Sequence, residues 1–319
     1  MLLTVILLIL GLVLIVGGAE ILVDGSSSVA RKAGISEFVI GLTIVGIGTS
    51  APEMVVSFLG AIEGNADVAI GNVIGSNIFN VLFITGITAL ILPLALSPDT
   101  KKEVVPINIA VSLLVLALGM KKSLFGIGEN TLGRLDGILM LVLFGIYMYR
   151  SLKNGRQDPD EHEGETKTRG TFVSIVLIVC GIAALVAGGK LFVNSATAIA
   201  RVLHVSDKFV AITILAGGTS LPELATCVVA AARKKGQLAL GNVIGSNIFN
   251  ILLILGGSAV ITPLSLASIT FVDMGVLILS AVLLLLAAYT GRNDKIGRCD
   301  AALFLLCYAA YIFWLFKHL

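Results

Sequence analysis

The chain has 319 residues, of which 57% are hydrophobic and only 13% are charged, and its mean hydropathy is +1.02. A soluble domain carries about 25% charged residues, so this composition excludes an ordinary soluble protein and predicts one that is dissolved in lipid. The formal net charge of +2, without a basic stripe interleaved with aromatic residues, excludes a nucleic-acid-binding protein.

Ten apolar stretches are long enough to cross a bilayer, which requires about 20 residues. Five precede and five follow the hydrophilic stretch 151–170, whose charged residues, glycines and proline are typical of a flexible linker. The sequence predicts an all-α membrane protein with a first five-helix unit over 1–150, a linker over 151–170 and a second unit over 171–319. The ten spans are expected near 2–23, 37–61, 68–95, 103–120, 133–150, 171–192, 207–232, 237–264, 271–290 and 299–316.

The two halves contain the same motifs in the same order. GNVIGSNIFN occurs at 71–80 and again, without a difference, at 241–250, and GTSAPE at 48–53 matches GTSLPE at 218–223. Both pairs are offset by 170 residues, so the chain contains an internal repeat. Because each repeat has an odd number of spans, the second copy is expected to enter the membrane from the opposite side, as in many secondary transporters.

The distribution of basic residues predicts the orientation. With the N-terminus outside, fifteen of the 22 Lys and Arg residues fall in inside loops and seven in outside loops or helix ends. The positive-inside rule therefore favours both termini outside the cell and a cytoplasmic linker.

Two acidic residues, Glu53 and Glu223, lie midway along apolar spans at equivalent points of the repeat. A charged group at the bilayer centre costs at least ~2.5 kcal/mol, so such a residue indicates a functional site. The alternative is a neutral glutamate that only forms a hydrogen bond to a neighbouring helix. Pro52 and Pro222 lack an amide proton and are expected to break the second and seventh spans near Gly48 and Gly218, which would free backbone carbonyls beside the carboxylates.

The second motif adds a polar stripe. Its members are spaced by four residues and so share one helix face, and they are Asn72, Ser76 and Asn80, repeated as Asn242, Ser246 and Asn250. Asn77 and Asn247 lie one position off this stripe, where a packing role is an alternative. The GxxxG spacing of Gly71 and Gly75, and of Gly241 and Gly245, is typical of close helix packing in membranes.

The expected cluster contains only oxygen ligands, with no His or Cys nearby in the sequence. Such a site suits hard cations rather than zinc or copper. Ca²⁺ takes about six to eight oxygens in flexible geometry. Two carboxylates would neutralise one Ca²⁺ or two Na⁺, and a site that holds these ions in turn is what an antiporter requires.

The motifs GIGTSAPE and GGTSLPE, each followed by GNVIGSNIFN, closely resemble the two alpha-repeats of the calcium/cation antiporter superfamily, and within it the prokaryotic sodium/calcium exchangers. The resemblance covers both halves. It implies a multi-pass protein of the prokaryotic cell membrane in which broken helices 2, 3, 7 and 8 form the ion-binding core. Helices 1 and 6 would slide past this core between inward-facing and outward-facing states.

The resemblance also implies roles for individual residues. Glu53 and Glu223 would bind Ca²⁺ and share the Na⁺ sites, and Thr49 and Thr219 would contribute oxygen atoms to the calcium site. Flanking sodium positions would be lined by Gly46, Ser50 and Ser76, mirrored by Ala216, Ser220 and Ser246, while Asn80 and Asn250 would face the centre. Many relatives carry Asp at the position of Asn250, so this chain has one carboxylate fewer than they do, which bears on any middle cation site.

The sequence thus predicts a secondary antiporter that exchanges Ca²⁺ for Na⁺, with the two ions and the lipid bilayer as its partners, no cofactor, and the monomer as the functional unit. A calcium/proton antiporter of the same fold is an alternative because a buried carboxyl group can also carry a proton. A cation channel is a second alternative. An enzyme is not expected, since no GxSxG, HExxH or Walker A motif is present.

Overall fold

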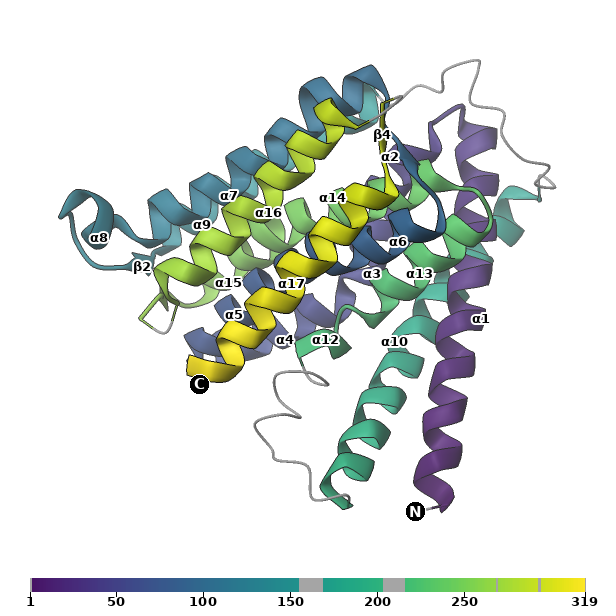
Figure 1. The fold of residues 1–319 in the computed structure, drawn as a ribbon, viewed down its shortest axis with the longest axis horizontal. Helices are drawn as coiled ribbons and strands as arrows, with labels where there is room; N and C mark the ends of the chain where they lie inside the picture. The colour runs from purple at the N-terminus through teal and green to yellow at the C-terminus, as the bar shows by residue number, and fades with distance from the viewer. Residues whose placement is uncertain (1, 155–168, 203–215, 268, 292–293, 319) are drawn as a thin grey trace.

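The computed structural model describes residues 2–154, 169–202, 216–267, 269–291 and 294–318 (Figure 1). Within these ranges, eight helices are long and apolar enough to cross a bilayer, or nine if a bent pair of helices counts as one span. The all-helical, multi-span prediction is therefore confirmed for the described part of the chain. The expected span 207–232 begins outside the described residues, and only its second part is seen.

The first half begins with α1 (Leu2–Ala33), followed by a span of four consecutive pieces. These are α2 (Glu37–Ile40), the π-helical η1 (Gly41–Val45), α3 (Gly46–Thr49) and α4 (Ala51–Ile62). The remaining elements are α5 (Ala66–Ile78), η2 (Phe79–Ile84), α6 (Thr85–Ile91), β1 (Leu94–Ala95), η3 (Thr100–Val104), α7 (Val105–Gly119), α8 (Lys121–Phe125), β2 (Thr131–Leu132) and α9 (Arg134–Asn154).

The second half repeats this order. It comprises α10 (Thr171–Val202), α12 (Ala216–Gly218), α13 (Leu221–Ala232), α14 (Gly236–Ile248), η5 (Phe249–Leu255), α15 (Gly256–Ile261), β3 (Leu264–Ser265), α16 (Phe271–Thr290), β4 (Lys295–Ile296) and α17 (Arg298–His318). The two π-helical segments η2 and η5 fall at equivalent positions of the repeat, 170 residues apart.

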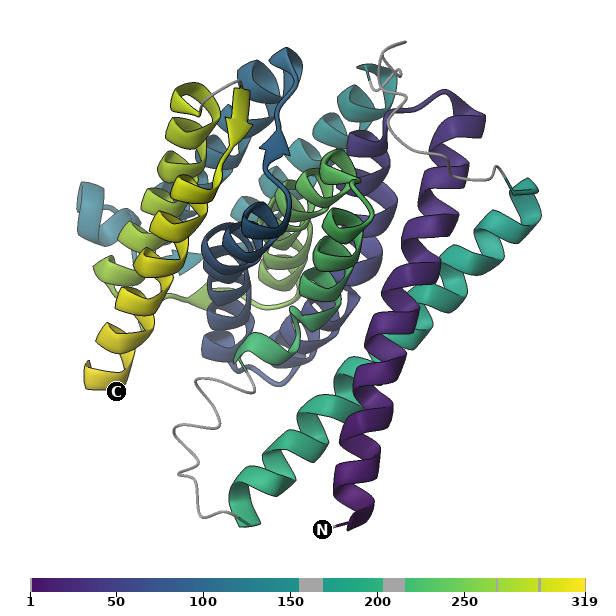
Figure 2. The same ribbon diagram turned by 45° about the vertical axis from the view of Figure 1, so that its right-hand side comes forward.

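Helices α1 and α10 form a crossed pair beside the other helices (Figure 2). Each has 32 residues, or about 48 Å, which exceeds the roughly 30 Å of a bilayer core. Glycines make the crossing close: a Cβ on Gly18 would lie 3.0 Å from the carbonyl oxygen of Gly181, and one on Gly188 would lie 2.8 Å from that of Gly11. Because the two backbones touch, the crossed pair is packed as one unit.

The centre of the protein is formed by the spans that carry the repeated motif. In the apolar window of the span Gly236–Ile261, 94% of the residues are buried, and in that of Ala66–Ile91 72%, whereas the windows of α9 and α17 have only 17% and 11%. Large apolar side chains on the outer helices are exposed, including Leu135 at 82% and Phe313 at 72%. This is the pattern of a protein whose outer surface faces lipid.

The two halves are linked at two places by short antiparallel strands. β1 of the first half pairs with β4 of the second, and β2 pairs with β3. β3 is the repeat equivalent of β1, so each half contributes the same segment to one of the two pairings. The pairings lie at opposite ends of the molecule (Figure 1). The repeats are therefore intertwined rather than side by side.

Of the four core spans expected to be broken, the second is bent, the seventh is described only from Ala216, and the third and eighth are continuous. The second span bends by 48° between Thr49 and Ala51. The third and eighth spans instead continue through η2 and η5, where the helix is locally widened but not interrupted. The difference follows from proline, which is present after the bend at Pro52 and absent from 66–91 and 236–261.

The GxxxG glycines differ between the copies. A Cβ on Gly241 would collide with the carbonyl oxygen of Phe38, and one on Gly245 with that of Leu42, so close helix packing is confirmed for this pair. No described atom lies within 4 Å of the corresponding positions on Gly71 and Gly75. The repeat equivalents of Phe38 and Leu42 lie in 203–215, outside the described residues.

Candidate cation site

The site begins at the bend between α3 and α4. Ser50 occupies the bend with φ −79° and ψ 8°, and its equivalent Ser220 has φ −87° and ψ 10°. In both copies a proline in the first turn of the next helix starts the helix again, and the glutamate follows it at once. The local sequence therefore places Glu53 and Glu223 in the first turn of a helix that begins inside the protein, where the N-terminal end of the helix favours negative charge.

The two glutamates are fully buried and are bound crosswise by the two serines. Ser50 Oγ donates to Glu223 Oε1 at 2.9 Å, and Ser220 Oγ donates to Glu53 Oε1 at 2.8 Å. Each carboxylate is thus held by the bend of the other repeat. This exchange brings both acidic groups into one polar cluster between the halves.

The motif serines differ in their contacts. Ser76 Oγ donates to Glu53 Oε1 at 3.4 Å and lies 3.1 Å from Ser220 Oγ. Its equivalent Ser246 instead donates to the carbonyl oxygen of Gly46 at 3.5 Å. The structure therefore places Ser76 beside a carboxylate and Ser246 beside a backbone carbonyl.

The threonines beside the bends each donate a hydrogen bond to an asparagine of the opposite repeat. Thr49 Oγ1 donates to Asn242 Oδ1 at 3.1 Å, and Thr219 Oγ1 donates to Asn72 Oδ1 at 3.3 Å. Asn72 Nδ2 in turn donates to the carbonyl oxygen of Glu53 at 3.1 Å. The sequence placed these asparagines on the polar stripe, and the structure adds that they tie the bend of one repeat to the motif helix of the other.

Asn77 and Asn247 accept hydrogen bonds from the side-chain amides of Asn250 and Asn80. Asn80 Nδ2 donates to Asn247 Oδ1 at 3.2 Å, and Asn250 Nδ2 donates to Asn77 Oδ1 at 3.0 Å. Asn77 Nδ2 also donates to the carbonyl oxygen of Asn247 at 3.1 Å. Asn77 and Asn247 therefore orient Asn80 and Asn250 by hydrogen bonds across the two repeats, a role that their place beside the stripe does not indicate.

Four buried oxygens of the cluster lack a hydrogen-bond donor among the described residues. They are Glu53 Oε2, Glu223 Oε2, Asn80 Oδ1 and Asn250 Oδ1. When both glutamates are ionised, all four atoms are acceptors and cannot satisfy one another, and buried polar groups that stay unpaired are costly. Two carboxylate and two amide oxygens are ligands that hard cations such as Ca²⁺ and Na⁺ accept.

The last two predicted residues lie at helix starts. Gly46 begins α3, where its carbonyl accepts from Thr49 at 3.5 Å, and a Cβ at this position would lie 3.1 Å from the ring of Phe249. Ala216 begins α12 at the edge of the described residues.

Comparison with known proteins finds relatives that cover nearly the whole chain. The family model described as "Sodium/calcium exchanger protein" matches residues 3–153 and 173–317. The chain is 36% identical over 343 residues to the sodium/calcium exchanger MaX1 of Methanosarcina acetivorans, with 97% of each chain covered. It is 37% identical over 300 residues to the uncharacterized membrane protein MJ0091 of Methanocaldococcus jannaschii, covering 94% of this chain and 93% of that protein.

Solved structures show the same likeness. The sodium-calcium exchanger NCX_Mj, soaked with 10 mM Na⁺ and no Ca²⁺, superimposes with a TM-score of 0.84 at 34% sequence identity, with 98% of each chain covered.

Proposed function

Because the chain belongs to the sodium/calcium exchanger protein family, whose members are antiporters rather than enzymes, we propose that it exchanges Ca²⁺ for Na⁺ across the cell membrane by alternating access. The ions bind at the cluster of Glu53 and Glu223. The complete fold has ten transmembrane helices in two inverted five-helix repeats, with the divided second and seventh helices and the π-helical third and eighth helices around the site.

The observation that carries this proposal is the set of four buried acceptor oxygens, one carboxylate and one amide oxygen from each repeat. A bound cation supplies the positively charged partner that these four oxygens lack. The remaining ligands come from Thr49, Thr219, Ser50, Ser220, Ser76, Ser246 and the backbone at Gly46 and Ala216.

Charge determines which ions can alternate. Glu53 and Glu223 are the acidic side chains of the described cluster, and together they balance one Ca²⁺ or two Na⁺. A pair of sodium ions and one calcium ion therefore compete for the same two charges, which couples the movement of one to the release of the other. Asn80 and Asn250 supply oxygen without further charge.

Flux into proteoliposomes tests the choice of counter-ion. Vesicles loaded with Na⁺ should accumulate radioactive Ca²⁺ when diluted into Na⁺-free buffer, and the uptake should vanish when the Na⁺ gradient is dissipated by an ionophore. Vesicles with only a proton gradient should take up no more Ca²⁺ than protein-free vesicles.

Uptake that follows the proton gradient and ignores Na⁺ would instead identify a calcium/proton antiporter. Single-channel currents in a planar bilayer would identify a channel, because an alternating-access carrier is too slow to produce resolvable unitary steps. Glu129→Gln, at an exposed loop position, is the matched control for handling and reconstitution.

A further inference from the structure

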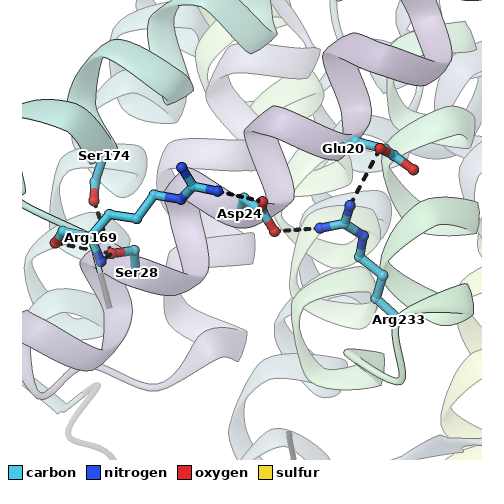
Figure 3. A network of polar contacts seen from close by, with 6 residues as sticks. All are labelled: Glu20, Asp24, Ser28, Arg169, Ser174 and Arg233. Carbon is cyan, nitrogen blue, oxygen red and sulfur yellow. Dashed lines mark hydrogen bonds and ion pairs between the residues drawn. The ribbon is translucent and has the colours of Figure 1, made fainter. Parts of the chain in front are cut away.

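A network of charged groups joins the crossed pair to the helix that carries Glu223 (Figure 3). Arg233, at the end of α13, forms ion pairs with Asp24 and, at 3.4 Å, with Glu20, both on α1. Asp24 also accepts from Arg169 at 3.5 Å. We call the contacts of Arg233 with Glu20 and Asp24 the linker-side latch, because they lie at the same end of the molecule as Arg169, which precedes α10.

The other contacts in this network stay within the crossed pair. The backbone amide of Arg169 donates to Ser28 Oγ at 2.9 Å, and Ser174 Oγ donates to the same oxygen at 2.9 Å. These bonds and the glycine contacts bind α1 to α10 as one unit. Arg233 therefore links this unit to the ion-binding core through ion pairs.

The repeat contains a second set of charges at the mirrored position. The 170-residue offset relates Glu20 on α1 to Lys190 on α10, and it relates Arg233 to Glu63. Arg233 and Glu63 are the C-cap residues that directly follow the glutamate-bearing helices α13 and α4. The mirrored pair thus retains complementary charge, but with the two signs exchanged.

This mirrored pair is open in the structure. Glu63 and Lys190 are both exposed, and they form no ion pair with each other. α1 packs along α13, whereas the described residues of α10 have no comparable packing against α4. Among the described residues, ion pairs therefore join the crossed pair to the end of a glutamate-bearing helix on one side of the molecule and not on the other.

We propose that Glu63 and Lys190 form a second latch, which closes in the state that faces the other side of the membrane while the linker-side latch opens. The proposal rests on the alternating access proposed above and assigns the contacts that alternate. Inverted repeats exchange their conformations when a transporter switches sides, so the contact made by Arg233 in one state should be made by Glu63 in the other.

The strength of the latch suits this role. The side chains of Arg233, Glu20 and Asp24 are 33%, 53% and 24% exposed, and each partly exposed ion pair biases an equilibrium by about two- to five-fold. Each latch therefore shifts the balance between the two states without trapping either of them.

Cross-linking tests whether the two latches exclude each other. The four native cysteines are first replaced by serine, and ion exchange is checked in this background. Glu20→Cys with Arg233→Cys reports the linker-side latch, and Glu63→Cys with Lys190→Cys reports the mirrored one. Both pairs are treated with a short bifunctional thiol reagent in Na⁺, in Ca²⁺ and without either ion, with the four single-cysteine variants as controls.

We expect each pair to cross-link in part of the molecules, and the variant with all four cysteines to carry one cross-link or the other but never both on one chain. Either cross-link should stop exchange until it is cleaved. Failure of the Glu63 and Lys190 positions to cross-link in vesicles that are exchanging ions would overturn the proposal, as would both cross-links on one chain.

Swapping the charged side chains of the mirrored pair provides a second test, which does not depend on cysteine geometry. Glu63→Lys should slow exchange by about two- to five-fold, and Glu63→Lys combined with Lys190→Glu should restore it. Equal slowing in the single and double variants would overturn the latch. Mutual exclusion of the cross-links in a protein that does not exchange Na⁺ for Ca²⁺ would support the latch and reject only the proposed ions.

Discussion

Each of the two glutamates binds a serine of the opposite repeat with one carboxylate oxygen and leaves the other oxygen without a donor among the described residues. The serine contact fixes the direction of the carboxylate, so the second oxygen is already placed to bind a cation. A preorganised ligand loses little freedom on binding, which favours a site that must load and unload repeatedly.

Glu53→Gln and Glu223→Gln should each abolish calcium exchange. Gln keeps the shape of the side chain but removes one of two buried charges that balance the ion, and losing one partner of a buried charge pair costs about 3–5 kcal/mol, or more than about 100-fold in affinity. Binding of radioactive Ca²⁺ to purified protein measures the loss. Wild-type binding in either variant would remove that glutamate from the site.

Asn72→Ala should weaken Ca²⁺ binding more than the equivalent Asn242→Ala. Asn72 donates to the Glu53 carbonyl and, at 2.9 Å, to Ser57. Among the described residues, Asn242 donates only to the sulfur of Cys227, at 3.3 Å, which is a poor acceptor. A neutral hydrogen bond contributes about 1 kcal/mol, so the two variants should differ by up to roughly five-fold in affinity. Equal losses would mean that the unequal contacts have no effect on the ion.

The glutamates could be predicted from the sequence because a carboxylate inside an apolar span is rare, and the exact repeat identified its twin. The crosswise bonds could not be predicted, since sequence position alone does not say that Ser50 reaches Glu223 rather than Glu53. The roles of Asn77 and Asn247 were hidden for the same reason: their partners lie across the interface between the repeats.

At the scale of elements, the crossed pair depends on glycines that face the partner helix. Gly18→Ala should lower stability by about 1–3 kcal/mol, because its new Cβ would lie 3.0 Å from both Ala184 Cβ and the Gly181 carbonyl oxygen. The neighbouring Gly17 has nothing within 4 Å of a Cβ among the described atoms, so Gly17→Ala should be neutral or stabilising by about 0.5–1 kcal/mol.

Thermal unfolding in detergent, followed by the loss of soluble monomer, compares these two glycine variants. A fall in the melting temperature for Gly17→Ala as large as that for Gly18→Ala would show that the close contact with α10 is not what makes the Gly18 substitution destabilising.

The helices were the most predictable elements, because hydropathy and length define a span almost without reference to its neighbours. The bend at Ser50 was also foreseen, since proline has a local effect on the backbone. The π-helical segments and the pairing of β1 with β4 were not, because both depend on contacts between segments far apart in the chain.

At the scale of the whole molecule, the orientation in the membrane is a prediction from charge alone. Lys102, before α7, should face the cytoplasm, and Lys317, at the end of α17, should face outward, because this arrangement places fifteen of 22 basic residues inside. Both side chains are exposed, so cysteines introduced there should be accessible to reagents in water.

The test uses the cysteine-free background and a maleimide that does not cross membranes. Lys317→Cys should be labelled in intact cells with their outer barrier permeabilised, and Lys102→Cys should be labelled only after the cell membrane is opened. Each half has an odd number of spans, so the total is even and both termini lie on the same side of the membrane. The side found for one of the two positions therefore predicts the side of the other. Labelling of Lys102→Cys alone in intact cells would place both termini inside, and it would also reverse which latch faces the cytoplasm.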